Sequence, residues 1–347
     1  MQRIRTYIFL ILTGVAALTG CGLVDEDLSN CETDYRMDYE LRLVADIKAE
    51  IETQLEVVTD QSVSQALNDF LSRIFLDKAY DVDLGFYDVV RDEAAGDSLR
   101  LHHETHVLED NQTSFTLYIP IRDYRHLAVA NLYRVGDLSF DNAELCHGAR
   151  LSQLVRDTVP CHAAGLFTAR EDLIINQETA DQHFDVTLYM ANSATALVVD
   201  TLGSGVRSIR AYAEGFATGL NLCDSTYVFD YSPVVRAETL PLENPGYYCF
   251  TTVNFPSRDS LTTTTKADTD DSDPEKSLWR YYVYTEMPDG TVTLTILGIH
   301  SPLEAGHLKI IEAKVQENGS VQPGDATIGV SIVLDWQDGY NVEVPLE

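Results

Sequence analysis

The stretch YRMDYELRL, residues Tyr35–Leu43, alternates apolar and polar side chains along its whole length. A period of two puts one set of side chains on each face of a β-strand, so this stretch predicts a strand with one buried face. Farther along, Ile47, Ile51 and Leu55 continue the alternation, but they are also spaced as on a helix. The pattern therefore allows either a strand or a helix for the segment from Ile47 to Leu55.

A clear helical period follows. From Ser62 to Phe75, apolar side chains recur at intervals of three and four residues, as they do on the buried face of a helix. Ser62 and Gln65 match a capping box, in which each side chain satisfies a free backbone N–H of the first turn. We therefore expect one helix that begins at Ser62 and packs on a sheet.

Most of the remaining chain consists of short strand-like segments between turns. Met287–Gly290, with the sequence Met-Pro-Asp-Gly, lies between two such segments and is typical of a hairpin turn. Many short strands at this spacing predict β-sandwiches. The expected strands are 81–90, 99–107, 114–119, 126–133, 165–174, 184–190, 194–200, 206–213, 226–231, 234–240, 247–253, 279–286, 291–299, 308–315, 327–336 and 340–344.

The number of domains follows from length. A chain that runs from Cys21 to Glu347 is too long for one typical domain and suits two domains of about 150 residues each. The polar stretch Asn176–Gln182 is the expected boundary. We therefore predict an all-β protein with two tandem β-sandwich domains, 31–180 and 181–347, and one inserted helix.

The first residues have the features of a secretory signal. Arg3 and Arg5 precede the apolar run Tyr7–Leu18, which is shorter than the roughly 20 residues that a membrane span needs. The run ends in Leu-Thr-Gly-Cys, residues 18–21, which resembles the lipobox of bacterial lipoproteins. That resemblance implies that residues 1–20 are a signal peptide and that acyl chains are attached to Cys21. The alternatives are an ordinary cleaved signal or a retained membrane helix.

The residues that follow bear on the destination of the protein. Residues 21–30 form a short leader, in which Asp25–Asp27 is a run of three acidic side chains. The run resembles the signal that sends some lipoproteins to the outer face of the outer membrane, and a plain solvated leader is the alternative. We expect a lipid-anchored outer-membrane protein that is exposed at the surface, with the acyl chains of Cys21 as its contact with lipid.

The charge balance limits the classes of binding partner that we expect. The chain has 55 Asp and Glu against 24 Lys and Arg, a net charge of −31. So negative a surface repels nucleic acid and anionic lipid headgroups, which excludes both as expected partners.

Five cysteines remain after the lipidated one, and an oxidising exterior permits disulfides. Because five is odd, at least one thiol stays free unless it pairs between chains. Pairs that are local in sequence are Cys146 with Cys161 and Cys223 with Cys249. Sequence alone leaves the connectivity open; we expect at least one disulfide and favour Cys146–Cys161.

Two groups of side chains have some of the features of metal sites. His102, His103 and His106 surround Glu104, but on a strand His103 points away from the other two rings, so three-fold ligation is not expected. The Cys-His pairs at 146–147 and 161–162 lack the spacing of a zinc site. No nucleophile elbow, phosphate loop or dinucleotide motif is present, so we expect no cofactor and no enzyme.

Three parts of the chain carry a family resemblance. The opening combines the lipobox with the cysteine of Leu28–Cys31 and the strand from Tyr35. Phe184–Tyr189 followed by Ala194–Asp200 forms a strand pair, and Gly329–Trp336 is a closing strand. Together these parts resemble the FimB-like fimbrial anchor lipoproteins of type V pili, whose second domain opens with a similar strand pair.

The resemblance has two departures. The family commonly has a Gly-x-Tyr turn and a tryptophan in the strand expected at His126–Tyr133, and neither is present here. The helix expected at Ser62–Phe75 is an addition. The resemblance implies two transthyretin-like β-sandwich domains in tandem, and it implies a non-enzymatic subunit that anchors a fimbria and binds its shaft subunits.

Two rival functions predict different features. A surface glycan-binding lipoprotein would present an exposed aromatic pair on a flat face, for which the Trp279–Tyr284 strand is the candidate. A lipid-anchored hydrolase would need a concave pocket with converging polar groups.

The resemblance also suggests where a shaft subunit binds. In such pili a strand from one subunit completes the groove of the next, and backbone hydrogen bonds make this addition tight. The lipid at Cys21 lies on the segment that leads to the Tyr35–Leu43 strand, so that strand should stay in its own sheet. We expect the contact at the C-terminal tail, Tyr340–Glu347, or at the exposed edge that the tail borders. The alternative is a plain edge strand that closes the second domain.

Overall fold

The computed structural model describes residues 34–44, 47–56, 58, 60–76, 78–89, 97–109, 112–175, 182–260, 276–324 and 328–333. The expected signal peptide 1–20, the leader 21–30 with Cys21, and the tail 340–347 lie outside these residues. None of the helices in the described ranges is both long and apolar enough to cross a membrane.

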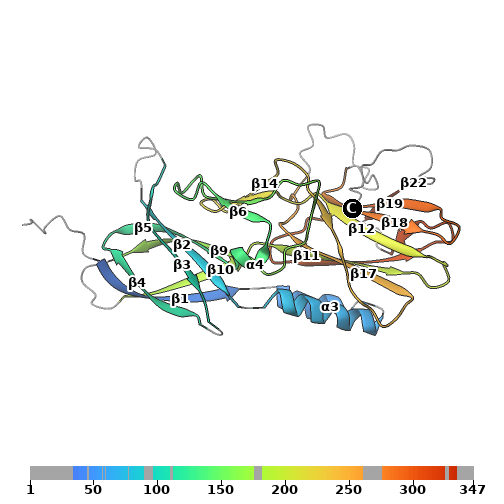
Figure 1. Ribbon diagram of the computed structural model, residues 1–347, viewed down its shortest axis with the longest axis horizontal. Helices are drawn as coiled ribbons and strands as arrows, with labels where there is room; N and C mark the ends of the chain where they lie inside the picture. The colour runs from blue at the N-terminus through green and yellow to red at the C-terminus, as the bar shows by residue number, and fades with distance from the viewer. Residues whose placement is uncertain are drawn as a thin grey trace, which may run out of the picture.

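The first half of the chain forms a seven-stranded sheet that folds over into two layers (Figure 1). Among the described residues, the backbones of the two layers pair only between β9 and β10, over two residues, whereas the other neighbouring strands pair over seven or eight. In order across the sheet, the strands are β3 (Arg100–Val107), β2 (Asp81–Asp88), β5 (Asp123–Ala130), β9 (Phe167–Ile174), β10 (Gln182–Met190), β1 (Asp34–Val44) and β4 (Ser114–Pro120).

Strand β1 behaves as its alternation predicts. Met37, Tyr39 and Leu41 are buried, and the polar residues between them are exposed. The strand lies between β4, which is antiparallel to it, and β10, which is parallel. Its inward side chains reach the opposite layer, where the Tyr39 hydroxyl meets Nε2 of His126 on β5 at 2.7 Å.

The second half of the chain forms a sandwich of two further sheets. Between them lie the largest side chains of this core, among them Trp279, Tyr281 and Phe250. One sheet has the order β16 (Glu238–Thr239), β17 (Tyr247–Asn254), β11 (Ser193–Asp200), β20 (Leu308–Val315) and β21 (Val321–Pro323). The other has the order β22 (Ile328–Val333), β19 (Val292–Ile299), β18 (Trp279–Glu286), β12 (Ser208–Glu214), β15 (Val234–Arg236) and β8 (Thr158–Val159).

Three helices occur in the described chain, where the sequence predicted one: α2 (Ile47–Leu55), α3 (Gln61–Ile74) and α4 (Leu132–Val135). The segment that was open between strand and helix is therefore helical. Helix α3 begins one residue before the expected start, and its N-cap is Asp60 rather than Ser62. The Asp60 carboxylate accepts hydrogen bonds from the backbone N–H groups of Ser62 and Val63, which satisfies two free donors of the first turn.

The helices α2 and α3 come from the first half of the chain but lie against the second sandwich (Figure 1). Asn244 donates a hydrogen bond to the Asp60 carboxylate at 2.9 Å. The side-chain amide of Gln54 on α2 donates to the carbonyl of Leu308 and accepts from the backbone N–H of Ile310. These contacts join the two halves on one side.

A small four-stranded sheet joins the two halves on another side. Its strands come from both halves, in the order β14 (Thr226–Val228), β13 (Gly219–Asn221), β7 (Arg150–Gln153) and β6 (Leu138–Asp141). We call it the bridging sheet. Beneath it lies a second hydrophobic core, to which both halves contribute, and which we call the junction core: Tyr87, Leu127, Val129, Leu132, Val135, Cys146, Ala149, Leu151, Ala164, Leu166, Ala191, Ala217, Leu220, Leu222, Cys223 and Phe255.

The prediction of an all-β protein with two tandem sandwiches is confirmed, and the predicted boundary between 180 and 181 is wrong. Strand β10 completes the first sandwich through eight parallel pairs with β1. Only Ala191 and Asn192 separate β10 from β11, the first strand of the second sandwich. Strand β8 of the first half also joins a sheet of the second. The division between the two sandwiches depends on pairing between segments that are distant in sequence. The polar stretch Asn176–Gln182 could not reveal that pairing.

Candidate functional site

The three histidines of β3 do not converge, as the strand geometry predicted. His102 and His106 each pair with one oxygen of Glu104, both at 2.8 Å. His103 points to the other face and pairs with Asp83 at 2.9 Å. The carboxylate of Glu104 is thus held between two rings, and these residues serve as ion pairs along an edge strand.

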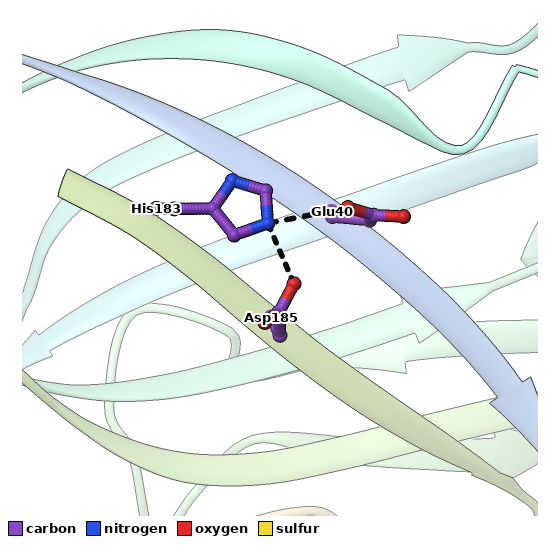
Figure 2. Close-up of side chains that lie close together, drawn as sticks. All are labelled: Glu40, His183 and Asp185. Atoms are coloured by element: carbon purple, nitrogen blue, oxygen red, sulfur yellow. Dashed lines mark ion pairs between the residues drawn. The ribbon is translucent and has the colours of Figure 1, made fainter. Parts of the chain in front are cut away.

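A different histidine lies among carboxylates on the outer face of the first sandwich. His183 and Asp185 on β10 lie beside Glu40 on β1, and Figure 2 shows both carboxylates facing the same ring nitrogen. His183 Nε2 is 2.8 Å from Asp185 and 3.2 Å from Glu40. The three side chains are about half exposed or more. Solvated groups of this kind form weak surface ion pairs.

The cysteines are arranged differently from the prediction. Cys146 lies beside Cys223, with 2.7 Å between the sulfur atoms, and not beside Cys161. The Cys161 sulfur lies 3.2 Å from the carbonyl of Arg236. The favoured Cys146–Cys161 pairing is therefore wrong for this structure: the two thiols belong to separate cores, and proximity in sequence does not bring them together. For the same reason the Cys-His pairs at 146–147 and 161–162 form no zinc set.

The strand that was the candidate for a glycan platform has one buried face, and its other face is half-buried. Trp279 and Tyr281 point into the core of the second sandwich, where they are 1% and 0% exposed. Tyr284 on the other face is 7% exposed, and the Tyr282 hydroxyl donates to Glu214. Strand β18 therefore presents no flat exposed aromatic pair.

Two further histidines are enclosed in the cores. His126 contacts Gly85 O and the Tyr39 hydroxyl, and His162 contacts Gln153 and Asn192. Burial lowers the pKa of each imidazole to about 3. Neutral rings with both nitrogens engaged stabilise the core and are not open to a substrate.

Two shallow grooves run along β20. One has a volume of about 340 Å³ and the other about 440 Å³, and neither is lined by histidine, cysteine or serine. In the larger groove, the amide of Gln54 bonds to both backbone groups that β20 presents at Leu308 and Ile310. Strand β21 pairs only with Ala313–Val315 of β20, so the Gln54 side chain occupies backbone groups in the earlier part of β20, to which another strand could otherwise bind.

The remaining sheet edges differ in length and charge. Strands β8, β16 and β21 are two or three residues long, and β3 carries histidines, an arginine and a glutamate. Short or charged edges resist pairing with other strands. Two longer edges have no charged side chain: β4, with the sequence SFTLYIP, and β22, with the sequence IGVSIV. We call these the open edges.

The open edges lie far apart along the molecule. In Figure 1, β4 and the start of β1 are near the left end, and β22 is toward the right end. The sequence predicted both strands, as 114–119 and 327–336, but periodicity alone does not show which strands end a sheet. Sequence reasoning missed Gln54, His126 and Asn192 as structural residues, because each depends on a partner that is distant in sequence.

These features define a class: an all-β protein of two sandwiches in which, among the described residues, an uncharged strand lies at a sheet edge near each end of the molecule. Structurally similar proteins include a Bacteroides ovatus protein assigned as an adhesin (TM-score 0.48, 11% identity, 92% of this chain and 99% of that one). The fimbrial anchor protein Mfa2 of Porphyromonas gingivalis is another (TM-score 0.45, 9% identity, 87% and 100%). A third, from Bacteroides thetaiotaomicron, is assigned as polysaccharide binding (TM-score 0.47, 9% identity, 84% and 99%).

No family model matches the sequence, and no curated protein matches it. We base the function on the residues of this chain.

Proposed function

We propose that the protein is a lipid-anchored outer-membrane subunit that binds a fimbrial shaft through strand addition at β22 and catalyses no reaction. The open edge of β22 carries this proposal. Its six residues include no charge, and Ile332 remains 45% exposed. An exposed apolar edge of this length favours aggregation unless another strand covers it, so a stable protein implies a partner strand.

The position of β22 supports the same function. The lipid site expected at Cys21 precedes β1, whose start lies at the opposite end of the molecule from β22 (Figure 1). A protein held to a membrane at one end presents its other end to a partner. The bridging sheet and the helices α2 and α3 connect the two sandwiches, so a pull on β22 is transmitted to β1 through a packed body.

The anchor is tested by replacing the cysteine. Cys21→Ser removes the thiol that would carry the lipids, and we expect the membrane-bound amount to fall about ten-fold or more. Quantitative blotting of soluble and membrane fractions measures it, with Cys249→Ser as a matched control that keeps the lipobox. Retention of the Cys21→Ser protein at the wild-type level would contradict lipid anchoring.

The contact with the shaft is tested by placing a charge on the open edge. Ile332→Lys puts an ammonium group on β22, and lysine at an edge opposes strand pairing. We expect about ten-fold less fimbrial subunit to co-purify with the detergent-solubilised protein, whereas the uncharged control Ile332→Thr keeps most of it.

A deletion tells whether the shaft binds to the C-terminal tail or to the edge of β22. Removing Tyr340–Glu347 leaves β22 in place, so fimbriae that stay attached to the truncated protein assign the contact to the edge. If Ile332→Lys binds fimbriae as the wild type does while it remains folded and membrane-bound, β22 is not the contact.

A further inference from the structure

Two thiols meet in the junction core. Cys146 belongs to the connection between β6 and β7, and Cys223 belongs to the turn between β13 and β14. Their sulfur atoms are 2.7 Å apart, and the residues are 0% and 3% exposed. A disulfide bond is about 2.05 Å long, so closure requires each sulfur to move by only a few tenths of an ångström.

Backbone pairing holds both thiols in this position. Three residues after Cys146, the carbonyl of Ala149 accepts from the N–H of Leu222, the residue before Cys223. The strands β7 and β13 then pair over three residues. The N–H of Cys146 itself donates to the carbonyl of Ser98 at 2.9 Å. The approach of the thiols is thus a property of the bridging sheet and not of two mobile side chains.

The other described thiols have different neighbours. Cys161 lies against the carbonyls of Arg236 and Thr251, at 3.2 and 3.6 Å. Cys249 lies opposite Val198 in the sheet of the second sandwich and is fully buried. Among the four cysteines that the structure describes, Cys146 and Cys223 alone place sulfur against sulfur.

We propose that Cys146 and Cys223 form a disulfide that joins the two halves of the chain across the bridging sheet. The oxidised state in the cell rests on the proposed export, because exported proteins meet an oxidising environment. The chemistry is thiol–disulfide exchange with a disulfide donor, either a dithiol–disulfide oxidoreductase or a small-molecule disulfide. One Sγ–Sγ bond forms in this chain, the donor's disulfide is reduced to two thiols, and the two protons of the cysteines pass to those thiols.

The link would close a loop between residues 77 positions apart. Long loops lose the most freedom in the unfolded chain when they are closed, so the bond stabilises the folded junction. It also changes how the protein bears load. A pull between β1 and β22 crosses the junction, where the disulfide would add a covalent connection to the hydrogen bonds of β7 and β13.

The burial of Cys146 determines when thiol–disulfide exchange can occur. Burial raises the pKa of the Cys146 thiol well above its ordinary value, so the folded protein has almost no thiolate there. Exchange is therefore slow from the folded state and proceeds while the chain folds. The test allows for this by refolding the protein in the redox buffer.

Tryptic peptides make the pairing directly measurable. Each of the four cysteines falls in its own peptide: 135–150, 157–170, 211–236 and 237–258. The full chain is reduced, unfolded, and refolded in oxidised and reduced glutathione. Free thiols are then alkylated under denaturing conditions, and the digest is analysed by mass spectrometry. We expect 135–150 linked to 211–236, and 157–170 and 237–258 largely alkylated.

Two results would overturn the proposal: alkylation of both Cys146 and Cys223 in correctly refolded protein, or a link that joins either of them to another cysteine. Because the oxidant is supplied in the tube, this outcome does not depend on export, which the fractionation of Cys21→Ser tests separately.

A stability measurement gives a second readout. Reduction of the wild type should lower the melting temperature by about 5 °C or more. The melting temperature of Cys146→Ala should not change on reduction, and Cys161→Ala should respond as the wild type does. A wild type whose melting temperature is the same with and without reductant would also contradict the bond.

Discussion

Lowering the pH from 7 to 5 should reduce the free energy of unfolding by about 4 kcal/mol, because two histidines stay neutral in the folded chain. His126 and His162 are buried, and their pKa values fall from 6.5 to about 3. In the unfolded chain both rings take up a proton as the pH drops through 6.5. The unfolded state then binds more protons than the folded state, so acid favours unfolding.

The contacts of the rings explain why they stay neutral. Desolvation is the main cause of the low pKa at both sites. At His126, a proton on Nδ1 suits the carbonyl of Gly85 at 3.0 Å, and Nε2 is left to accept from the Tyr39 hydroxyl. At His162, Nε2 donates to Gln153 and Nδ1 accepts from the amide of Asn192. A second proton would replace one acceptor with a donor in each network.

The size of the effect follows from the interval between the two pKa values. One pH unit inside that interval changes the stability by about 1.4 kcal/mol for each group. From the unfolded pKa of 6.5 down to pH 5 the interval is about 1.5 pH units. Each ring therefore lowers the free energy of unfolding by about 2 kcal/mol. Asp60, whose pKa is lowered from 3.8 by its hydrogen bond with Ser62, loses its contribution only at lower pH. Asp60 therefore adds little to the difference in stability between pH 7 and pH 5.

Urea unfolding at the two pH values measures this effect. A variant that removes one titrating ring, His126→Gln, should lose about half of the difference between pH 7 and pH 5. The control Asn221→Ala removes an amide that does not titrate, so it should keep the whole difference. A pH dependence that His126→Gln and His162→Gln both leave unchanged would mean that the buried rings are not its source.

Local patterns predicted the long elements well. Strand β1 and helix α3 each have one buried face, and a period of two or of three to four residues identifies such elements directly. The missed strands β6, β7, β8, β13 and β21 are two to four residues long, too short for any period. They are stabilised by pairing between positions up to about 80 residues apart, as in β8 with β15, and nothing in their own sequence records that pairing.

The same limit applies to the residues of the junction. Cys146 pairs with Cys223 instead of Cys161 because the bridging sheet brings distant turns together. The N-cap of α3 is Asp60 because its carboxylate reaches the first free N–H groups, whereas the sequence pattern also fitted Ser62. In both cases the local sequence fits the observed arrangement and the alternative, Cys161 or Ser62, equally well.

Replacing Asn192 should be the most destabilising single polar change in the junction. Asn192 is one of the two residues between β10 of the first sandwich and β11 of the second, and it is 0% exposed. Its Oδ1 accepts from the N–H of Leu166 at 3.2 Å, and its Nδ2 donates to the carbonyl of Ala164 at 2.8 Å. The same amide lies 3.4 Å from Nδ1 of His162. One side chain thus satisfies polar groups of the segment that leads into β9.

Asn192→Ala leaves these groups buried without partners. Each unpaired buried group costs about 1–3 kcal/mol, so we expect a loss of about 4 kcal/mol in the free energy of unfolding. The control Asn221→Ala removes an amide that bonds only to the exposed hydroxyl of Thr226, and it should change stability by less than about 0.5 kcal/mol. Hydrogen exchange should quicken at Leu166 before it does at Leu41 in β1, because the junction opens first. Equal losses for the two variants, or unchanged exchange at Leu166, would show that Asn192 does not hold the sandwiches together.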